Sequence, residues 1–285
     1  MYAITGISGQ VGGAVARSLL AQGLPVRAVL RDAGKAPAWR ARGCEVALAA
    51  MDDAVALARA FAGAEAVFVL LPPDFDPAPG FPATRAVIAA LAAALRQAGP
   101  RRVVCLSTVG AQASQENLLS QLQEMEHVLG QLPMPIAFLR AAWFMENAAW
   151  DLAGAREHGL VPSLLQPTSR AIPMVATADV GALAAQLLRQ PWQGRKVVEL
   201  EGPARVSPDE LAAVLGRLLA RRVVAQAVPR EDWEARLRAQ GSRHPLPRMR
   251  MLDGFNQGWI TFEHATIKGE TALEQVLRGL LEGAP

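Results

Sequence analysis

Short apolar runs and amphipathic stretches alternate along most of the chain. The mainly apolar runs predict strands over residues 2–5, 26–30, 45–48, 66–71, 102–106, 136–139 and 197–200. Apolar residues that recur every three or four positions predict helices over residues 36–43, 52–62, 84–98, 115–129, 177–188, 231–240 and 271–281, and two more that follow Gly12 and Ser207. This alternation predicts an α/β fold with a parallel, doubly wound sheet.

A glycine-rich turn joins the first predicted strand to the first predicted helix. Its spacing is G-x-x-G-x-x-G over residues 6–12. Glycine lets the backbone turn tightly and approach a pyrophosphate, and the helix N-terminus supplies N–H groups with a partial positive charge. The alternative is a glycine-rich turn that binds nothing. The turn predicts dinucleotide binding through Gly6, Ser8, Gly9, Gln10, Val11 and Gly12.

The end of the second predicted strand indicates which dinucleotide is bound. About twenty residues past the glycines, NAD sites place a carboxylate on the ribose hydroxyls. Here the first polar residue is Arg31, Lys35 follows, and Asp32 should point to the opposite side of the strand. A guanidinium can pair with the 2′-phosphate of NADP(H), so we expect NADP(H) as the cofactor. An ordinary exposed strand-end arginine is the alternative for Arg31.

The charge balance gives little support to nucleic acid as a partner. The net charge of +3 arises from 29 basic and 26 acidic residues, and the arginines form no long run. One loose basic cluster indicates either a solvated face or a polyanion site. Its members are Arg238, Arg243, Arg248 and Arg250.

Cysteine usage and hydropathy favour a reduced, cytoplasmic protein. Cys44 and Cys105 have no His or Cys partner at ligand spacing, so we expect no metal site. The N-terminus lacks a basic leader, and Arg, Gln or Pro interrupt the long apolar stretches, so we expect no signal peptide and no membrane span. No helix stripe stands out as an interface, which leaves a homodimer open.

Several segments together resemble the NmrA-like group of atypical short-chain dehydrogenases. The resemblance covers nearly the whole chain in the right order. It implies a Rossmann domain over residues 1–150 and a smaller substrate-side region over residues 151–285, partly interleaved, with a cleft between them. The group includes NADPH-dependent quinone reductases, dye reductases and redox-sensing regulators. The segments that carry it are 26–31, 66–73, 138–147, 172–179, 201–203 and 255–259.

Some positions depart from the pattern of this group. The third strand often ends in Gly-Asp, where this chain has Ala49-Ala50. A carboxylate contact to adenine from that position is therefore missing, which leaves Met51 and Asp52 as neighbours of the adenine. The proline that follows the arginine of the sixth strand is Ala141 here.

The resemblance also implies a mostly apolar nicotinamide and substrate site. We expect Leu71, Pro72 and Ser107 on the cofactor side, and Pro73, Thr108, Trp143, Phe144 and Asn147 on the substrate side. Core packing is the alternative for residues 143–145. Ser107 and Thr108 either bond a substrate or cap the following turn.

The usual proton donor of the superfamily is missing. A Tyr-x-x-x-Lys site needs a lysine that lowers the pKa of the tyrosine. The only tyrosine is Tyr2, in the first predicted strand, and Leu122 stands where many relatives have a lysine. The four histidines are scattered and fit a surface role. The three lysines, Lys35, Lys196 and Lys268, all lie far from the predicted helix that follows Ser107. The sequence therefore indicates no catalytic residue.

Two further features concern the second half of the chain. Asp179 is expected to cap the helix over 177–188. A group of large apolar residues near the C-terminus forms a flap over the pocket, a satellite core or a subunit contact. Its members are Met249, Met251, Leu252, Phe255 and Trp259.

The sequence thus predicts an NADPH-dependent reductase that transfers hydride to a quinone-like or similarly activated small molecule. An electron-poor acceptor suits a site without an acid, because its reduced oxygen can take a proton from solvent. A non-enzymatic NADP(H)-sensing regulator with a protein partner is the alternative.

Overall fold

The centre of the computed structural model, which describes residues 1–283, is an eight-stranded parallel sheet. The strand order is β12-β10-β6-β5-β4-β1-β2-β3, and every neighbouring pair is parallel. The predicted fold class is confirmed. The strands are β1 (Tyr2–Ile4), β2 (Val26–Leu30), β3 (Glu45–Leu48), β4 (Ala66–Val69), β5 (Arg102–Thr108), β6 (Ile136–Ala141), β10 (Arg195–Glu201) and β12 (Ile267–Lys268).

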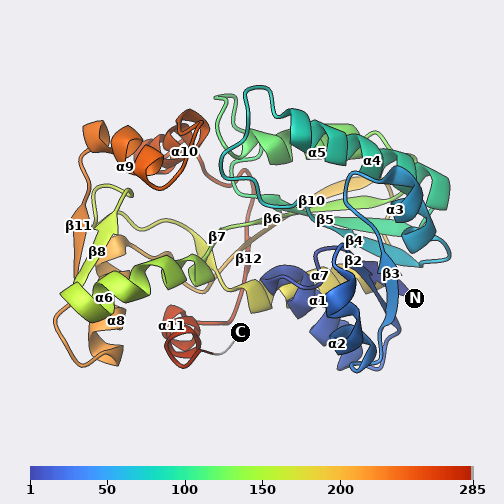
Figure 1. The fold of residues 1–285 in the computed structure, drawn as a ribbon, viewed down its shortest axis with the longest axis horizontal. Helices are drawn as coiled ribbons and strands as arrows, with labels where there is room; N and C mark the ends of the chain where they lie inside the picture. Colours follow the sequence, from blue (N-terminus) through green and yellow to red (C-terminus); the bar gives the residue numbers. More distant parts are fainter. Residues whose placement is uncertain (284–285) are drawn as a thin grey trace.

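Helices cover both faces of this sheet (Figure 1). Val67 of β4 faces one apolar cluster, and its neighbour Phe68 faces the other. Strands buried on both faces contain continuous apolar runs, which explains the pattern in the sequence. One face carries α1 (Gln10–Leu20), α2 (Ala36–Arg40) and α7 (Thr177–Arg189), and the other carries α3 (Ala54–Phe61), α4 (Pro82–Ala98) and α5 (Ser120–Leu129).

The direction of strand addition reverses between β1 and β4. From β1 the chain adds β2 and β3 toward one edge, and from β4 it adds β5 and β6 toward the other. Loops diverge at such a reversal, and the carboxyl ends of the strands form a crevice there. This topology places the glycine turn after β1 beside the loops that follow β4, β5 and β6.

A smaller helical region lies beside the carboxyl ends of the strands, on the left in Figure 1. Its core contains Trp233, Leu215 and Leu277. Two parallel strand pairs, β7 with β9 and β8 with β11, belong to it. Its elements are β7 (Trp143–Phe144), α6 (Leu152–His158), β8 (Leu160–Ser163), β9 (Met174–Val175), α8 (Pro208–Leu218), β11 (Val224–Ala227), α9 (Trp233–Ala239), α10 (Leu246–Gln257) and α11 (Leu273–Leu281).

The described residues also form three short 3₁₀ helices: η1 (Ala33–Lys35), η2 (Met145–Asp151) and η3 (Arg230–Asp232). The chain after residue 150 also supplies α7, β10 and β12 to the large sheet assembly. The two regions are therefore interleaved. The boundary at residue 150 stays a prediction, and residues 284–285 of the second predicted region lie outside the described residues.

Two predicted elements are shorter than expected because side chains bond the backbone. The strand over 66–71 ends at Val69, because the Leu70 N–H donates to the Thr5 hydroxyl at 3.1 Å and two prolines follow Leu71. The helix over 115–129 begins at Ser120, because Asn117 Oδ1 accepts the Leu119 N–H at 2.8 Å and forms a turn.

One expectation for the second half is wrong, and another agrees with one of its alternatives, the satellite core. Asp179 does not cap α7, whose N-cap is Ala176. Its carboxylate instead accepts the hydroxyl and N–H of Thr271, at 2.7 and 3.0 Å, ahead of α11. The apolar group near the C-terminus lies mainly on α10, a helix that the sequence pattern did not indicate. Four members are buried in the core of the smaller region: Met249, Met251, Leu252 and Phe255.

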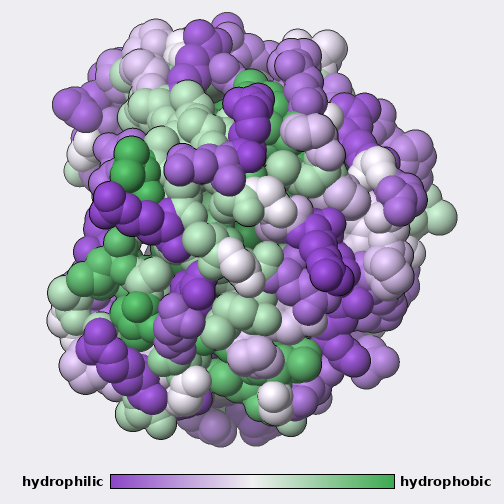
Figure 2. All heavy atoms as spheres, turned by 90° about the vertical axis from the view of Figure 1, so that its right-hand side faces the viewer, coloured by the Kyte–Doolittle hydropathy of each residue, from purple (hydrophilic) through white to green (hydrophobic). Residues whose placement is uncertain are grey.

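The outer surface is mixed in character. Figure 2 shows the side at the right of Figure 1, where hydrophilic side chains are interspersed with apolar ones. Leu48 and Val55 are large apolar residues that stay exposed on β3 and α3, which is common on folded proteins. Among the described residues, no helix combines the length and hydrophobicity needed to cross a bilayer.

Asp76 connects the loop after β4 to the segment between α9 and α10. Its carboxylate accepts hydrogen bonds from the Ser242 hydroxyl at 2.5 Å and from the N–H groups of Arg243 and His244 at 2.9 and 2.7 Å. Desolvation favours the neutral acid, but these three donors outweigh it and hold the pKa of Asp76 well below its usual range. The contact links the two regions across the crevice.

Asp76→Ala should lower the free energy of unfolding by about 1–3 kcal/mol at pH 7, because three donors lose a charged acceptor. A carboxyl with a depressed folded pKa stabilises the fold above its unfolded pKa, so the difference should shrink as the pH falls below about 4. Urea unfolding at several pH values measures both effects. Glu116→Ala, which removes an exposed partner 3.7 Å from Arg250, is the control; an equal loss in both variants would contradict the assignment.

Candidate functional site

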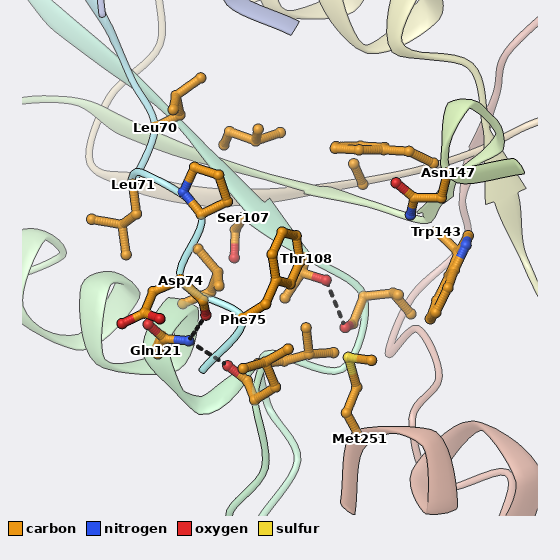
Figure 3. A pocket seen from close by; sticks show the side chains of 18 of the residues that line it. Leu70, Leu71, Asp74, Phe75, Ser107, Thr108, Gln121, Trp143, Asn147 and Met251 are labelled. Carbon is orange, nitrogen blue, oxygen red and sulfur yellow. Dashed lines mark hydrogen bonds between the residues drawn. The ribbon is translucent and has the colours of Figure 1, made fainter. Parts of the chain in front are cut away.

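A pocket of about 250 Å³ lies at the carboxyl ends of β4, β5 and β6 (Figure 3). Leu70 and Leu71 form one side of it, Ser107 and Thr108 its floor, and Trp143 the opposite side. The structure brings together here the predicted residues Leu71, Pro72, Pro73, Ser107, Thr108, Trp143, Phe144 and Asn147. Met251 and Phe255, two members of the apolar group for which a flap over the pocket was one alternative, also line it. Lining residues that the sequence did not indicate include Phe75, Leu118, Gln121, Trp150 and Arg248.

The glycine turn adjoins this pocket and leaves a cradle for an anion. Gly6 has a φ of 58°, and a Cβ there would lie 2.7 Å from a methyl group of Leu70. A Cβ on Gly12 would overlap the carbonyl oxygen of Gly6. Gly9 is the N-cap of α1, and neither a side-chain cap nor an acidic residue occupies its first turn. The N–H groups of this turn therefore fit a pyrophosphate.

The cations expected near a 2′-phosphate lie at the end of β2. Arg31 is exposed, and within residues 1–283 it makes neither an ion pair nor a side-chain hydrogen bond; Lys35 is exposed at the end of η1. Asp32 Oδ1 accepts a hydrogen bond from the Gly34 N–H at 2.8 Å, so this carboxylate caps the turn that begins η1. Met51 follows β3 and is partly buried against the core. The geometry leaves the cationic groups available to a phosphate.

The usual proton donors lie away from the pocket. Its lining, among the described residues, includes no Tyr, Lys or His. Tyr2 is buried in β1 beside Ala66, at the amino ends of the strands, and burial raises its pKa. Lys268 pairs with Glu201 at 2.7 Å, and Leu122, at the position where the family resemblance implies a lysine, lines the pocket. Within residues 1–283, no tyrosine and lysine therefore meet at this pocket.

The hydroxyl of Ser107 is hydrogen-bonded within the protein. Its hydroxyl donates to Glu126 Oε1 at 2.5 Å. Arg140 Nε and Nη2 donate to the two oxygens of the same carboxylate, at 2.9 and 2.7 Å. Nη1 of Arg140 also meets Glu199 at 3.4 Å and Glu263. Of the two alternatives for Ser107, the structure shows neither: the hydroxyl is part of this network behind the pocket floor.

The pKa of Arg140 shows how strongly the network holds its charge. Burial alone would lower that pKa, but the hydrogen bonds and charges of Glu126 and Glu263 raise it above its ordinary value. Thr108, next to Ser107, donates to the carbonyl oxygen of Val109 at 3.2 Å (Figure 3). The hydroxyls on the pocket floor are therefore used within the protein.

Gln121 fixes the loop that forms the left side of Figure 3. Its Nε2 donates to the carbonyl oxygens of Asp74 and Leu118, each at 3.1 Å, and its Oε1 accepts the Thr84 hydroxyl at 2.6 Å. The sequence pattern did not indicate this role for Gln121. Gln121 positions the loop that carries Pro72 and Pro73.

Comparison with known proteins now gives the family. The model of the NmrA-like family matches residues 2–254. The chain belongs to the NmrA-like family. Quinone oxidoreductase 2 of Escherichia coli is 30% identical over 243 residues, which cover 85% of this chain and 82% of that protein. The NAD(P)H azoreductase of Xenophilus azovorans is 27% identical over 248 residues, which cover 86% and 83% of the two chains.

A solved structure agrees with this assignment. The NADPH-dependent quinone oxidoreductase of Escherichia coli, solved in complex with NADPH, superimposes with a TM-score of 0.83 at 26% identity and covers 99% of this chain and 100% of its own. The resemblance seen in the sequence is confirmed across the whole fold. The roles of individual site residues stay predictions.

Ser107→Ala should lower the free energy of unfolding by about 1–2 kcal/mol, because Glu126 loses a buried donor. It should change the turnover of an acceptor by less than about threefold, since this hydroxyl faces the network rather than a substrate. Thermal unfolding and steady-state rates measure the two effects. Ser114→Ala, at an exposed serine, should change neither; a large loss of turnover at unchanged stability would assign Ser107 to the substrate.

Proposed function

We propose that this member of the NmrA-like family is an NADPH-dependent oxidoreductase that reduces a quinone-like or similarly activated small molecule. The observation that carries the proposal is the apolar pocket beside the glycine turn, which holds no Tyr, Lys or His among its described lining residues. Its named relatives, a quinone oxidoreductase and an azoreductase, support the same chemistry.

The cofactor would lie across the carboxyl ends of the strands. The turn of Gly6, Gly9 and Gly12 would hold the pyrophosphate, and Arg31 with Lys35 would hold the 2′-phosphate. The floor and side formed by Leu71, Pro72 and Ser107 would face the nicotinamide, and Met51 the adenine. Bound NADPH would supply a hydride. The protein orients the two reactants, because the apolar walls hold them close together and exclude water.

The kind of acceptor decides whether the site needs a proton donor. Hydride transfer delivers two electrons and one proton, and the reduced acceptor takes its second proton from water. A quinone or an azo bond tolerates this arrangement because the developing anion is delocalised. An ordinary carbonyl would form an alkoxide, which needs an acid beside it. The pocket therefore favours electron-poor acceptors.

A sensor without activity is the weaker alternative. The relatives that match most of this chain are named as reductases. We also propose a cytoplasmic location, because Cys44 and Cys105 are both free and buried. The homodimer that the sequence left open stays a prediction, which light scattering of the purified protein would test.

Turnover distinguishes the reductase from the sensor. Purified protein with NADPH should oxidise it in the presence of quinones, azo dyes or triarylmethane dyes, and not in their absence. The loss of NADPH absorbance measures the rate. Tight binding of NADP⁺ with no oxidation by any acceptor of this panel would contradict the enzyme and favour the sensor.

Arg31→Asp tests the choice of cofactor. The variant should weaken NADPH binding by about tenfold to a hundredfold, because a charged partner of the phosphate is lost, and should affect NADH binding far less. Isothermal titration with both cofactors measures the ratio. Arg96→Asp makes the same charge change at an exposed position near the end of α4 and is the control. Equal losses for NADPH and NADH would refute the phosphate role.

A further inference from the structure

A cation on the substrate side of the pocket has no ion-pair partner among the described residues. Arg248 is a partly buried residue of α10. It lines the main pocket and also an adjoining cavity of about 140 Å³. The cavities share five lining residues, so Arg248 lies where they meet. The shared residues are Trp143, Phe144, Asn147, Trp150 and Arg248.

The other arginines of the same basic cluster are paired. Arg238 pairs with Glu234 at 2.8 Å, Arg243 with Asp76 at 3.6 Å and Arg250 with Glu116 at 3.7 Å. Arg248 has neither an ion pair nor a side-chain hydrogen bond among residues 1–283. Burial lowers its pKa, which reflects a guanidinium removed from water without a compensating charge.

The carboxylates of the same walls leave Arg248 unpaired. Asp151 lines the adjoining cavity, and burial raises its pKa to about 6. Among residues 1–283 the two groups form no ion pair, so Arg248 does not neutralise Asp151. Asp74 lines the main pocket, but its Oδ1 accepts the N–H of Asp76 at 3.0 Å. The cation therefore has room for a negative group from a ligand.

A second free donor lies beside this cation. Asn147 lines both cavities, and within the described part of the chain its side-chain amide makes no hydrogen bond. Figure 3 shows this amide directed toward the interior of the pocket. The other polar residues of the floor and loop, Ser107, Thr108 and Gln121, are all engaged. Asn147 and Arg248 are thus donors without protein acceptors on the same wall.

The mouth of the pocket carries two exposed aromatic rings. Phe75 and Trp150 line it, and their side chains are exposed by 50% and 62%. The rings meet edge to face, with centroids 6.1 Å apart and planes at 87°. They come from the loop after β4 and from η2. Exposed rings in this position favour a planar aromatic ligand.

We propose that the substrate is a planar aromatic acceptor that carries an oxyanion, a carboxylate or a sulfonate, which Arg248 and Asn147 bind while the rings of Phe75 and Trp150 receive the aromatic body. This inference rests on the proposed reductase function, whose substrate class it narrows. The oxyanion satisfies the unpaired guanidinium in a partly dry site, where such a pair is stronger than in water. The reacting part of the ligand then lies toward the apolar floor.

The test measures binding without turnover, so that it stands apart from the test of the reductase. An anthraquinone sulfonate and the corresponding uncharged sulfonamide are titrated by calorimetry into the protein saturated with NADP⁺. The wild type should bind the sulfonate about tenfold or more tightly than the sulfonamide, as expected for a hydrogen-bonded charge. Arg248→Met should bring the ratio of the two dissociation constants close to one.

Two further variants make the result specific. Arg248→Lys, which keeps the charge but loses the planar fork, should restore part of the preference. Arg250→Met removes an exposed arginine from the same helix and should leave the ratio as in the wild type. Equal affinity of the wild type for both ligands, or the same ratio in Arg248→Met as in the wild type, would overturn the proposal. A protein that binds the sulfonate selectively but oxidises no NADPH would refute the reductase and keep the anion subsite.

Discussion

The buried guanidinium of Arg140 organises the centre of this protein. It lies on β6, bonds both oxygens of Glu126 on α5 and meets Glu199 on β10. Glu126 in turn holds the Ser107 hydroxyl of β5, and Glu199 accepts the N–H groups of Glu263 and His264 before β12. Taking these charges out of water is costly, and only complete pairing and hydrogen bonding offset that cost. The network therefore fixes the relative positions of three strands and a helix directly behind the pocket floor.

The same network explains the chemical character of the pocket. The polar groups that the sequence places near the reaction site point away from it, or are bonded to their neighbours, so the walls that remain are apolar. Such a site can hold two flat reactants together and keep water out, but it offers no acid of its own. The choice of acceptor then compensates for the missing proton donor. The free polar groups, Arg248 and Asn147, lie on the substrate-side wall. There they contribute to the choice of substrate and not to the transfer of a proton.

Local patterns in the sequence predicted most of the sheet, and the family resemblance predicted part of the pocket lining. Strands buried on both faces give continuous apolar runs, and a glycine turn before a helix is visible in a few letters. Contacts between distant residues could not be predicted in this way. Glu126 and Arg140 are fourteen residues apart and meet Glu199 and Glu263 only in space. The helix over Leu246–Gln257 was missed because arginine, proline and glycine interrupt its apolar face, and with it the place of Arg248 in the pocket wall.

The interleaving of the two regions has a consequence for how the protein unfolds. After β6 the chain enters the smaller region, returns to the sheet for α7 and β10, leaves again for α8 to α10, and returns once more for β12. Neither region is therefore a continuous piece of chain. Loss of one would withdraw elements from the other, so the two should melt in one cooperative transition. A chain cut between β6 and α6 would leave an incomplete sheet with an open edge at β6, because α7, β10 and β12 would lie on the other piece.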